Sequence, residues 1–357
     1  MTNKRVLIDL SVLKHPYCGL GQIALNYIRL INATDTAALP FRIVLLVPKS
    51  FYGCCGDKVD YVPRKRIYHW FPFLYPKVDV WHAIHQLSPF MPYSADTKYL
   101  LTIHDFNFMY EKTDKIKEKY RRRVQHKIER ADYITCISHF TATELATLMH
   151  KPAGTPVQVI YNGVEFAPEG AKEAKPSAVL TDKPFLFSIG EIKEKKNFLA
   201  IIRMMRQMPD YRLYIAGNDQ TAYADTCRRY IKKYGINNAF LLGIVNNAER
   251  QWLYNHCTAF LFPSLFEGFG LPVIEAMGHR KPVFSSSATS LSEIGGNHVA
   301  FFEDFEPEHM AEQVMTQLPS LQTDTALDES EAYARSFSYD KHFQSYIQLY
   351  KHLLDEQ

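Results

Sequence analysis

The sequence predicts two α/β domains, each built around a doubly wound parallel sheet. Short apolar runs rich in β-branched and aromatic residues alternate with longer stretches of helical pattern. The runs form two series, separated by residues 166–184, which are rich in Pro, Ala, Lys and Glu. Strands that alternate with helices are typical of parallel sheets, and 357 residues suffice for two such domains.

The first series of apolar runs predicts an N-terminal domain over residues 1–165. Its expected strands lie in RVLIDL, FRIVLLV, VDVWHAI, KYLLTIHD and YITCIS. The second series, FLFSIG, RLYIAG, AFLLG, AFLFPS and PVFSSS, predicts a C-terminal domain over residues 185–340, with residues 166–184 as the linker. Residues 341–357 have an apolar stripe at helical spacing, which predicts a C-terminal helix that packs back on the first domain.

Composition narrows the function classes. A formal charge of +3 is too small for the concentrated basic surface that a nucleic-acid partner requires. No apolar run is long enough to span a membrane, and the start of the chain predicts a first strand rather than a signal peptide. The six scattered cysteines predict free thiols in a reducing cytosol.

The segment AFLFPSLFEGFGLPVIEAMGHRKPV is expected to carry the chemistry. A buried strand, Ala259 to Phe262, leads through a Pro-Ser turn and a glycine-containing loop into a helix that Pro272 opens. Such a helix start offers unpaired backbone N–H groups and a partial positive charge. Because Gly268 and Gly270 carry no Cβ, a ligand can approach their backbone closely. The segment therefore predicts a site for an anionic group such as a diphosphate.

Two carboxylates border this loop. Glu267 precedes it and Glu275 is expected in the first helical turn, so both can face one pocket. A carboxylate only accepts hydrogen bonds, which suits Glu275 to a ribose diol and Glu267 to sugar hydroxyls. Each such charged hydrogen bond contributes roughly 1.5 to 3 kcal/mol. In the structural alternative, Glu275 merely favours the helix dipole and Glu267 is a solvated loop residue.

The phrase from Glu267 to Ala276 resembles the E-x7-E signature of the retaining glycosyltransferases of family 4, also called group 1, which have the GT-B fold. The resemblance covers most of the chain, since TIHDF, CISHFTATEL, VIYNGVE, FSIGEIKEKKN, LYIAGN and SLSEIGG follow in the family's usual order. It implies two Rossmann-like domains that face an interdomain cleft. It further implies that the acceptor binds mainly to the first domain and a nucleotide-sugar donor mainly to the second, without a metal ion or cofactor.

The resemblance also assigns residues around the donor. It implies that Glu275 holds the ribose, that Glu267 holds the donor sugar, and that Lys195 and Lys196 match the family's R-K-N phrase beside the diphosphate, with Glu267 and Lys196 as catalytic residues. Many relatives have an Arg directly after the preceding glycine, where this chain has Glu191, so the second cation must be Lys195 or lie elsewhere. The alternative for KEKKN is a solvated turn. The other donor-side positions are Gly190, Gly268, Phe269, Gly270, Leu271, Gly19, Gly21 and Glu293.

Gly19 and Gly21 in HPYCGLGQIALNYI superficially fit a dinucleotide fingerprint. In such a fingerprint the first glycine directly follows the strand, but residues 11–18 intervene here, and no acidic residue ends a second strand about 20 residues later. NAD binding is therefore not favoured. The resemblance implies instead a glycine loop at the cleft, near the donor phosphates or the acceptor, with a purely structural turn as the alternative.

Histidines end two of the strands expected in the first domain. His104 and Asp105 stand at the carboxyl edge, where α/β sheets bind ligands. The resemblance places such a pair near the donor sugar, so His104 is predicted to be catalytic, and the alternative is a hydrogen-bonded structural residue. His82 and His85 lack a nearby Cys or carboxylate to complete a metal site, so they are predicted to line the acceptor cleft.

The run KIKEKYRRRVQHKIER, residues 115–130, is basic and helical in pattern. It could contact anionic lipid or a lipid-diphosphate acceptor, and the alternative is a solvated helix face.

The resemblance, together with these observations, implies a cytoplasmic hexosyltransferase of polysaccharide biosynthesis, with peripheral contact with the inner membrane face as an option. The donor would be a GDP-, UDP- or ADP-linked hexose, with mannose as the working assumption, and the acceptor a glycan or a lipid-linked saccharide. The resemblance implies retention of configuration by front-face attack. Two alternatives remain: a nucleotide-sugar epimerase of the same fold, which needs no acceptor, and an inactive nucleotide-binding assembly protein.

Overall fold

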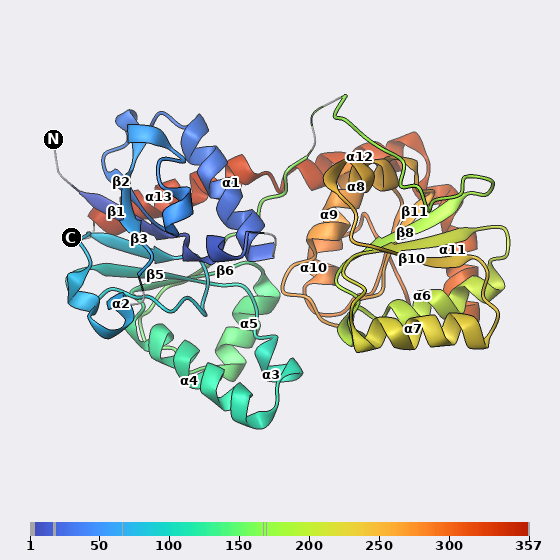
Figure 1. Ribbon diagram of the computed structural model, residues 1–357, viewed down its shortest axis with the longest axis horizontal. Helices are drawn as coiled ribbons and strands as arrows, with labels where there is room; N and C mark the ends of the chain where they lie inside the picture. Colours follow the sequence, from blue (N-terminus) through green and yellow to red (C-terminus); the bar gives the residue numbers. More distant parts are fainter. Residues whose placement is uncertain (1–3, 17–18, 66, 167, 169, 356–357) are drawn as a thin grey trace. The chain divides into compact units, whose positions relative to one another are not determined.

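The computed structural model describes residues 4–16, 19–65, 67–166, 168 and 170–355, and the chain divides into two compact units. The first unit comprises residues 1–163 and 338–357, and the second comprises residues 164–337. Each unit has a parallel sheet with helices on both faces (Figure 1). The predicted fold class, two doubly wound α/β domains, is confirmed.

The sheet of the first unit has the strand order β3-β2-β1-β4-β5-β6-β7. The chain order reverses between β1 and β4, so their carboxyl ends form the switch point at which doubly wound folds bind ligands. The strands are β1 (Arg5–Asp9), β2 (Arg42–Val47), β3 (Asp60–Pro63), β4 (Val80–Ala83), β5 (Lys98–Ile103), β6 (Tyr133–Cys136) and β7 (Val157–Val159). The central strands are almost continuously apolar because helices cover both faces.

Two layers of helices enclose this sheet. Helices α1 and α13 pack on one face and α4 and α5 on the other. The helices are α1 (Gly19–Ala33), α2 (Ile67–Trp70), α3 (Phe108–Glu111), α4 (Asp114–Arg130), α5 (His139–Leu148) and α13 (Tyr339–Asp355). Short 3-10 turns are η1 (Ser11–Lys14), η2 (Thr36–Ala38), η3 (Lys49–Phe51), η4 (Gly56–Lys58) and η5 (Pro72–Leu74).

The sheet of the second unit has the strand order β10-β9-β8-β11-β12-β13, with its switch point between β8 and β11. The strands are β8 (Phe185–Ile189), β9 (Arg212–Ala216), β10 (Ala239–Gly243), β11 (Ala259–Phe262), β12 (Val283–Ser285) and β13 (Ala300–Phe301). The helices are α6 (Phe198–Met204), α7 (Ala222–Lys233), α8 (Asn247–His256), α9 (Leu271–Gly278), α10 (Leu291–Gly295), α11 (Pro307–Leu321) and α12 (Asp324–Arg335), with 3-10 turns η6 (Glu194–Lys196) and η7 (Met205–Gln207).

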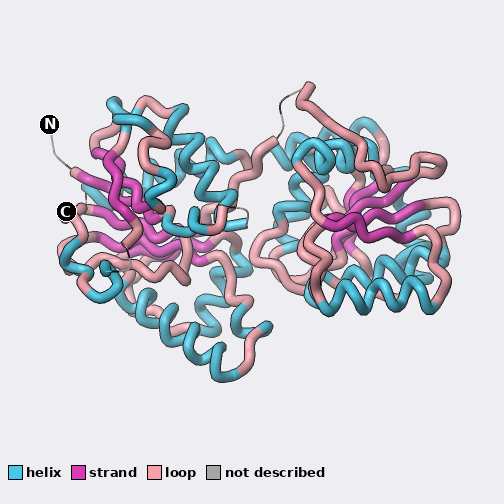
Figure 2. The backbone as a smooth tube through the Cα atoms, viewed as in Figure 1, coloured by secondary structure: helices cyan, strands magenta, loops and turns pink. Residues whose placement is uncertain are grey.

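Residues 166–184, which were expected to link the two domains, belong to the second unit. Their described part runs as a loop along that unit (Figure 2). The N–H of Ala174 donates to the carbonyl of Ala248 at 3.1 Å, and the N–H of Leu180 donates to the hydroxyl of Tyr214 at 2.9 Å. These backbone hydrogen bonds to residues distant in the sequence fix the described part of the segment in place.

A buried polar network holds α13 on the first sheet. His82 Nδ1 lies 2.6 Å from the hydroxyl of Tyr350, and its Nε2 lies 2.8 Å from Thr102 Oγ1. The hydroxyl of Tyr346 lies 3.0 Å from Thr102 and from Thr135. His82 is completely buried, so the prediction that it lines an acceptor cleft is wrong. Its Nδ1 contacts the C-terminal helix directly, and its Nε2 contacts Thr102 of β5, whose hydroxyl in turn lies beside Tyr346 of that helix.

Acid is expected to destabilise the protein through the buried histidines of this region. Desolvation lowers the pKa of His342 to about 4 and that of His82 well below its ordinary value. An unfolded histidine titrates near pH 6.5, so between about pH 6.5 and 4 the unfolded chain binds protons that the folded chain does not. Stability is therefore full above pH 6.5 and falls below it by about 1.4 kcal/mol per pH unit for each such histidine. Thermal unfolding followed by circular dichroism across this range measures the effect.

Two variants identify the source of the pH dependence. His342 Nδ1 donates to the carbonyl of Tyr161 at 2.7 Å, which leaves Nε2 to accept from the hydroxyl of Tyr27 at 3.2 Å. His342→Gln should give a shallower loss of stability between pH 6.5 and 4 than the wild type. His352→Gln, on the exposed side of the same helix, should keep the wild-type slope. Equal slopes in all three proteins would contradict the assignment.

Two further properties concern the described part of the chain. Cys54, Cys55, Cys136, Cys227 and Cys257 are free thiols, whereas Cys18 lies outside the described residues. None of the described helices combines the length and apolarity that crossing a lipid bilayer requires.

Candidate active site

The switch point of the second sheet brings together two loops that are distant in the sequence. One follows β8 and contains residues 190–197; the other follows β11 and contains residues 263–270. Because β8 and β11 are parallel neighbours, both loops leave the same edge of the sheet. The order of the strands thus places the KEKKN segment beside the loop that precedes α9.

Lys196 and Glu267 form an ion pair across the two loops, in which Lys196 Nζ donates to Glu267 Oε1. Each side chain is only 14% exposed, and the ammonium lies 5.1 Å from the ring centroid of Phe262. Lys196 therefore does not belong to a solvated turn, and Glu267 is not a solvated loop residue. The site has one cation and one carboxylate at a largely desolvated edge.

The backbone of Lys195 ties the first loop to the second. Its carbonyl accepts from the N–H of Leu265 at 2.7 Å and from the hydroxyl of Ser264 at 3.2 Å. Asn197, in the left-handed region with φ of 52°, then turns the chain into α6. Glu191, where many relatives have an Arg, is exposed and pairs with Lys193 at 2.8 Å. The role of Lys195 beside a diphosphate stays a prediction.

Hydroxyl groups before α10 shape the loop that holds Glu267. The N–H of Glu267 donates to Thr289 Oγ1 at 3.0 Å. The buried hydroxyl of Ser290 lies within hydrogen-bond distance of two carbonyls, that of Glu267 at 3.0 Å and that of Phe269 at 2.8 Å. Sequence reasoning missed both hydroxyl residues. The available signal was their place directly before a helix, in the same SLSEIGG region that predicted Glu293.

The remaining predicted residues of this loop have different surroundings. Gly268 and Phe269 are buried, and the ring of Phe269 packs edge-on at 6.0 Å from that of Phe337, inside the unit. Gly270, with φ of 117°, precedes α9, which begins at Leu271. The N-terminus of this eight-residue helix therefore follows the loop, as the sequence predicts.

Glu275 lies in the second turn of α9, so its expected place in the first turn is wrong. Its Oε2 accepts from the hydroxyl of Tyr254 at 2.8 Å, and its Oε1 lies 3.6 Å from Arg250. Burial, followed by the charge of Glu275, raises the pKa of Tyr254 well above its ordinary value, which keeps this tyrosine a donor. Sequence reasoning identified neither α8 partner. A carboxylate held in this way still has lone pairs that can accept hydrogen bonds from a ligand. A favourable interaction with the helix dipole alone would not require these two partners.

Glu293 lies in the first turn of α10 and is partly buried. Its backbone carbonyl accepts from the hydroxyl of Tyr333 at 3.4 Å, which joins α10 to α12. Its place near a nucleotide base stays a prediction.

In the first unit, His104 is buried at the end of β5. Its Nε2 donates to the carbonyl of Ile84 at 2.8 Å, and its backbone N–H donates to Gln86 at 3.1 Å. Desolvation lowers the pKa of His104 to about 4, so the ring is neutral near pH 7. Since Nε2 carries the proton, Nδ1 is the acceptor and could receive a hydrogen bond from a sugar hydroxyl. Asp105 accepts from the N–H of Asn107 at 2.9 Å and so shapes the next turn.

The expected glycine loop of the first unit is wrong, because Gly19 and Gly21 belong to the first turn of α1. A Cβ on Gly21 would lie 2.3 Å from the carbonyl oxygen of His15 and 2.6 Å from that of Pro16. Close packing of α1 on the preceding turn therefore explains Gly21. Gly19 is exposed, and a Cβ there would meet no described atom within 4 Å, so packing does not explain it.

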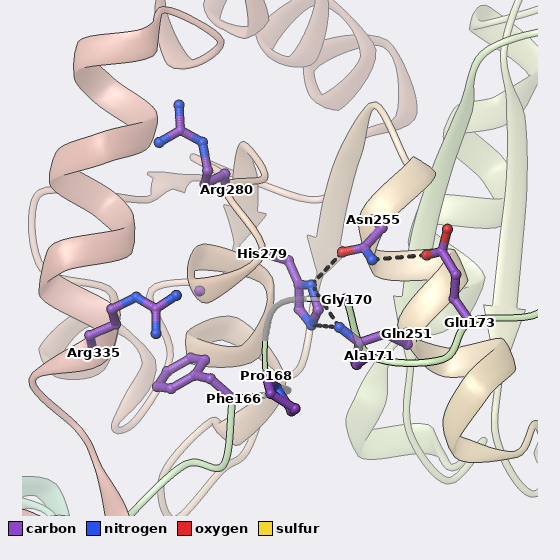
Figure 3. A pocket seen from close by; sticks show the side chains of 11 residues that line it. Phe166, Pro168, Gly170, Ala171, Glu173, Gln251, Asn255, His279, Arg280 and Arg335 are labelled. Carbon is purple, nitrogen blue, oxygen red and sulfur yellow. Dashed lines mark hydrogen bonds between the residues drawn. The ribbon is translucent and has the colours of Figure 1, made fainter.

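A separate cavity of about 380 Å³ lies at the opposite end of α9, roughly 12 Å along the helix from its start (Figure 3). There His279 Nδ1 lies 2.7 Å from Asn255 Oδ1, and the guanidinium of Arg335 lies 5.4 Å from the ring centroid of Phe166. None of the residues predicted to bind the donor lines this cavity. Among the described residues, no group of three or more His, Cys, Asp and Glu side chains is arranged to hold a metal ion.

Two family models match the chain, one for each series of strands. The model of "Glycosyltransferase Family 4" matches residues 35–167, and that of "Glycosyl transferases group 1" matches residues 171–330. The second match includes the loops of Lys196 and Glu267, and the first includes His104.

Curated relatives bear the names of sugar transferases. The chain is 24% identical to O-antigen chain mannosyltransferase B of Escherichia coli, over 97% of this chain and 99% of that protein. It is 30% identical to the serotype-specific mannosyltransferase WbdA of Escherichia coli over 49% of this chain, but this match covers only 23% of that longer protein.

Solved structures share the fold of the chain. A sucrose-phosphate synthase from Thermosynechococcus elongatus matches with a TM-score of 0.71 at 16% identity, over 99% of this chain and all of that one. HepE of Anabaena, solved in complex with UDP and glucose, matches with a TM-score of 0.70 at 18% identity, over 97% and 99% of the two chains.

Proposed function

Since the chain belongs to the glycosyltransferases of family 4, or group 1, and has the GT-B fold, we propose that it is a retaining mannosyltransferase that uses a nucleotide-linked donor. The observation that carries the proposal is the ion pair of Lys196 and Glu267 at the switch point of the second sheet. A nucleotide-sugar presents a diphosphate for the ammonium and hydroxyl groups for the carboxylate. This site offers one group of each kind.

The ribose and the diphosphate have further partners in the same unit. Glu275, oriented by Tyr254 and Arg250, would accept from the ribose diol. The start of α9 and Lys196 would stabilise the diphosphate, and more strongly as negative charge grows on the departing phosphate. Lys195 is the proposed second cation. We propose that this charge stabilisation replaces a metal ion and that no cofactor takes part.

Mannose is the proposed sugar because curated relatives named mannosyltransferases match the chain, one of them over almost its whole length. GDP is the proposed carrier, and a glycan or lipid-linked saccharide of polysaccharide synthesis is the proposed acceptor. In the retaining reaction the acceptor hydroxyl attacks from the face that the diphosphate leaves and passes its proton towards the departing phosphate oxygen. His104, neutral with Nδ1 as an acceptor, would bind a hydroxyl of the donor sugar.

A thermal-shift panel with GDP, UDP, ADP and their sugars tests the donor site. A ligand that binds only the folded state at 100 times its Kd adds about 2.7 kcal/mol of stability. GDP and GDP-mannose should raise the Tm of the wild type. Glu275→Ala should lose most of this response, whereas Glu312→Ala, an exposed glutamate of α11, should keep it. The absence of a response to every nucleotide would overturn the proposal and favour an assembly protein.

A reaction with GDP-mannose and octyl α-mannoside tests transfer itself. Retention requires an α-linked disaccharide, which NMR identifies by the one-bond C–H coupling at the new anomeric carbon, because the H1–H2 coupling of mannose is small in both anomers. An isomerised sugar nucleotide in the absence of acceptor would instead identify an epimerase.

We propose a cytoplasmic protein that contacts the inner face of the membrane, where a lipid-linked acceptor would be presented. The observation in favour is α4, whose exposed residues include Lys115, Lys119, Arg122 and Arg123. Its charge suits anionic lipid, and no nucleic-acid partner is proposed.

A further inference from the structure

The first unit exposes a cluster of large apolar side chains that the proposed reaction does not use. This cluster, here called the aromatic patch, consists of Ile67, Trp70, Phe71, Phe73, Leu74 and Tyr93. Trp70 is 76% exposed, Tyr93 69% and Phe73 59%. The ring of Phe73 lies 5.9 Å from that of Phe71 and 6.3 Å from that of Tyr93, so residues from two segments form one surface. Exposed apolar clusters of this kind mark interaction sites.

The segment under the patch is anchored from inside. The rings of Tyr68 and Tyr75 lie against each other with centroids 4.2 Å apart and planes tilted by 33°, and both pack on the core of the unit. Tyr75 also contacts the buried Trp81 edge-on at 4.8 Å. Because the inner side is fixed in this way, α2 and η5 present their other apolar side chains outwards on a firm base.

Positive charge surrounds the patch. Residues 62–78 contain four lysine and arginine residues and no acidic one. Lys65 and Lys77 are exposed, and the guanidinium of Arg64 lies over the ring of Phe90 at 5.8 Å. An apolar centre beside a mainly basic segment is complementary to a surface that is both apolar and anionic, although the Tyr93 loop also exposes one acidic side chain, Asp96.

The basic helix α4 continues this rim. Arg130 at its end donates to the carbonyls of Ser94 at 2.9 Å and Thr97 at 2.7 Å, and Lys127 donates to that of Ser88. The loop that carries Tyr93 is thus fastened to α4 on one side and contacts Phe73 on the other. Further along the same helix, from about 10 Å beyond Arg130 onwards, lie the exposed basic side chains of Lys115, Lys119, Arg122 and Arg123.

We propose that the aromatic patch is the surface by which this protein binds an anionic phospholipid membrane. Trp and Tyr favour the level of the headgroups, Phe and Leu reach the acyl boundary, and the basic rim attracts the negative surface. A second copy of the chain fits less well, because pairing this face with itself would bring like charges together. The inference rests on the peripheral location proposed above and extends it from α4 to a defined apolar surface.

Trp70 makes the inference directly measurable. Among the three tryptophans, Trp81 is buried and Trp252 is half-buried, so a change of environment at the patch appears mainly in Trp70. With vesicles of phosphatidylcholine and phosphatidylglycerol, the emission should shift to the blue and the protein should sediment with the lipid. Vesicles of phosphatidylcholine alone should bind at least tenfold more weakly, and added salt should reduce binding to the anionic vesicles.

Variants separate the apolar and charged contributions. Phe73→Ser/Leu74→Ser retains the Trp70 reporter and should weaken vesicle binding more than tenfold, as should Lys65→Gln/Lys77→Gln on the rim. Ile244→Ser, which changes a side chain of the second unit that is 79% exposed, should bind as the wild type does.

Three results would overturn the inference: no binding to either vesicle, binding unaffected by the patch variants, or a dimer in sedimentation that the Phe73→Ser/Leu74→Ser variant dissolves. None of these readouts uses a donor or an acceptor. If the protein responds to GDP but does not bind vesicles, only the membrane-binding surface is refuted. If it binds vesicles but responds to no nucleotide, only the proposed transferase function is refuted.

Discussion

Lys196→Ala is expected to lower kcat for sugar transfer by about 100- to 1,000-fold with a much smaller change in donor KM. The magnitude is typical of removing one preorganised group that stabilises developing charge. Lys196 has a fixed position because it pairs with Glu267 and lies over Phe262. Its electrostatic effect should therefore be largest when negative charge leaves with the phosphate. Steady-state release of the nucleoside diphosphate in the presence of acceptor measures it.

Lys193 offers a matched control for this variant, since it lies on the same loop but is exposed and pairs with Glu191. Lys193→Ala should change kcat less than about threefold, as expected for an exposed ion pair that contributes little. If both lysine variants lose activity equally, the loop rather than the buried cation is responsible. If Lys196→Ala keeps full kcat, the role assigned to Lys196 is wrong.

Gly217→Ala is expected to give the largest loss of stability. Gly217 follows β9 with φ of 139°, and a Cβ there would lie 1.9 Å from the carbonyl oxygen of Gly190. The backbone of the Gly190 loop would have to move, in addition to the strain at φ. Together these effects should cost roughly 2 to 6 kcal/mol, a large part of the stability of an ordinary domain. Urea unfolding measures the loss.

The control for this substitution is Gly235→Ala, at a residue that also has a positive φ, of 61°, but no described atom within 4 Å of the added Cβ. Gly235→Ala measures the free-energy cost of a left-handed backbone at a residue with a Cβ, about 1 to 2 kcal/mol, without any steric contact. Because the Gly190 loop carries Lys196, Gly217→Ala should also lower transfer activity in protein that remains folded. Equal losses of stability in the two variants would mean that the contact with Gly190 does not matter.

The elements and the central loop follow from local sequence patterns. Continuous apolar runs predict the strands, which helices cover on both faces. The Pro-Ser turn, the glycines and Pro272 predict the start of α9. The pairing of Lys196 with Glu267 is different. The ion pair forms only because β8 and β11 are neighbours in the sheet, and no local sequence pattern specifies that order. The sequence pointed to a shared site for the two residues only through the resemblance to a family.

The contacts that sequence reasoning missed are those between side chains that are far apart in the sequence. Tyr254 orients Glu275 from another helix, Ser290 holds the Glu267 loop from the turn before α10, and His82 contacts Tyr350 across 268 positions. A histidine at a strand end has the same local signature whether it faces a cleft or a helix added at the end of the chain. The order of strands and the path of the C-terminus decide between these cases.

The path of the chain has a consequence for biosynthesis. The second unit is continuous in sequence, whereas the first is interrupted between residues 163 and 338, where the N–H of Val164 donates to the carbonyl of Phe337 at 2.7 Å. As the ribosome produces the chain, the second unit can complete its sheet while the first still exposes the face that α13 will cover. The unit that begins the protein is thus the last to be finished, and a nascent chain arrested before residue 339 carries one closed core and one open one.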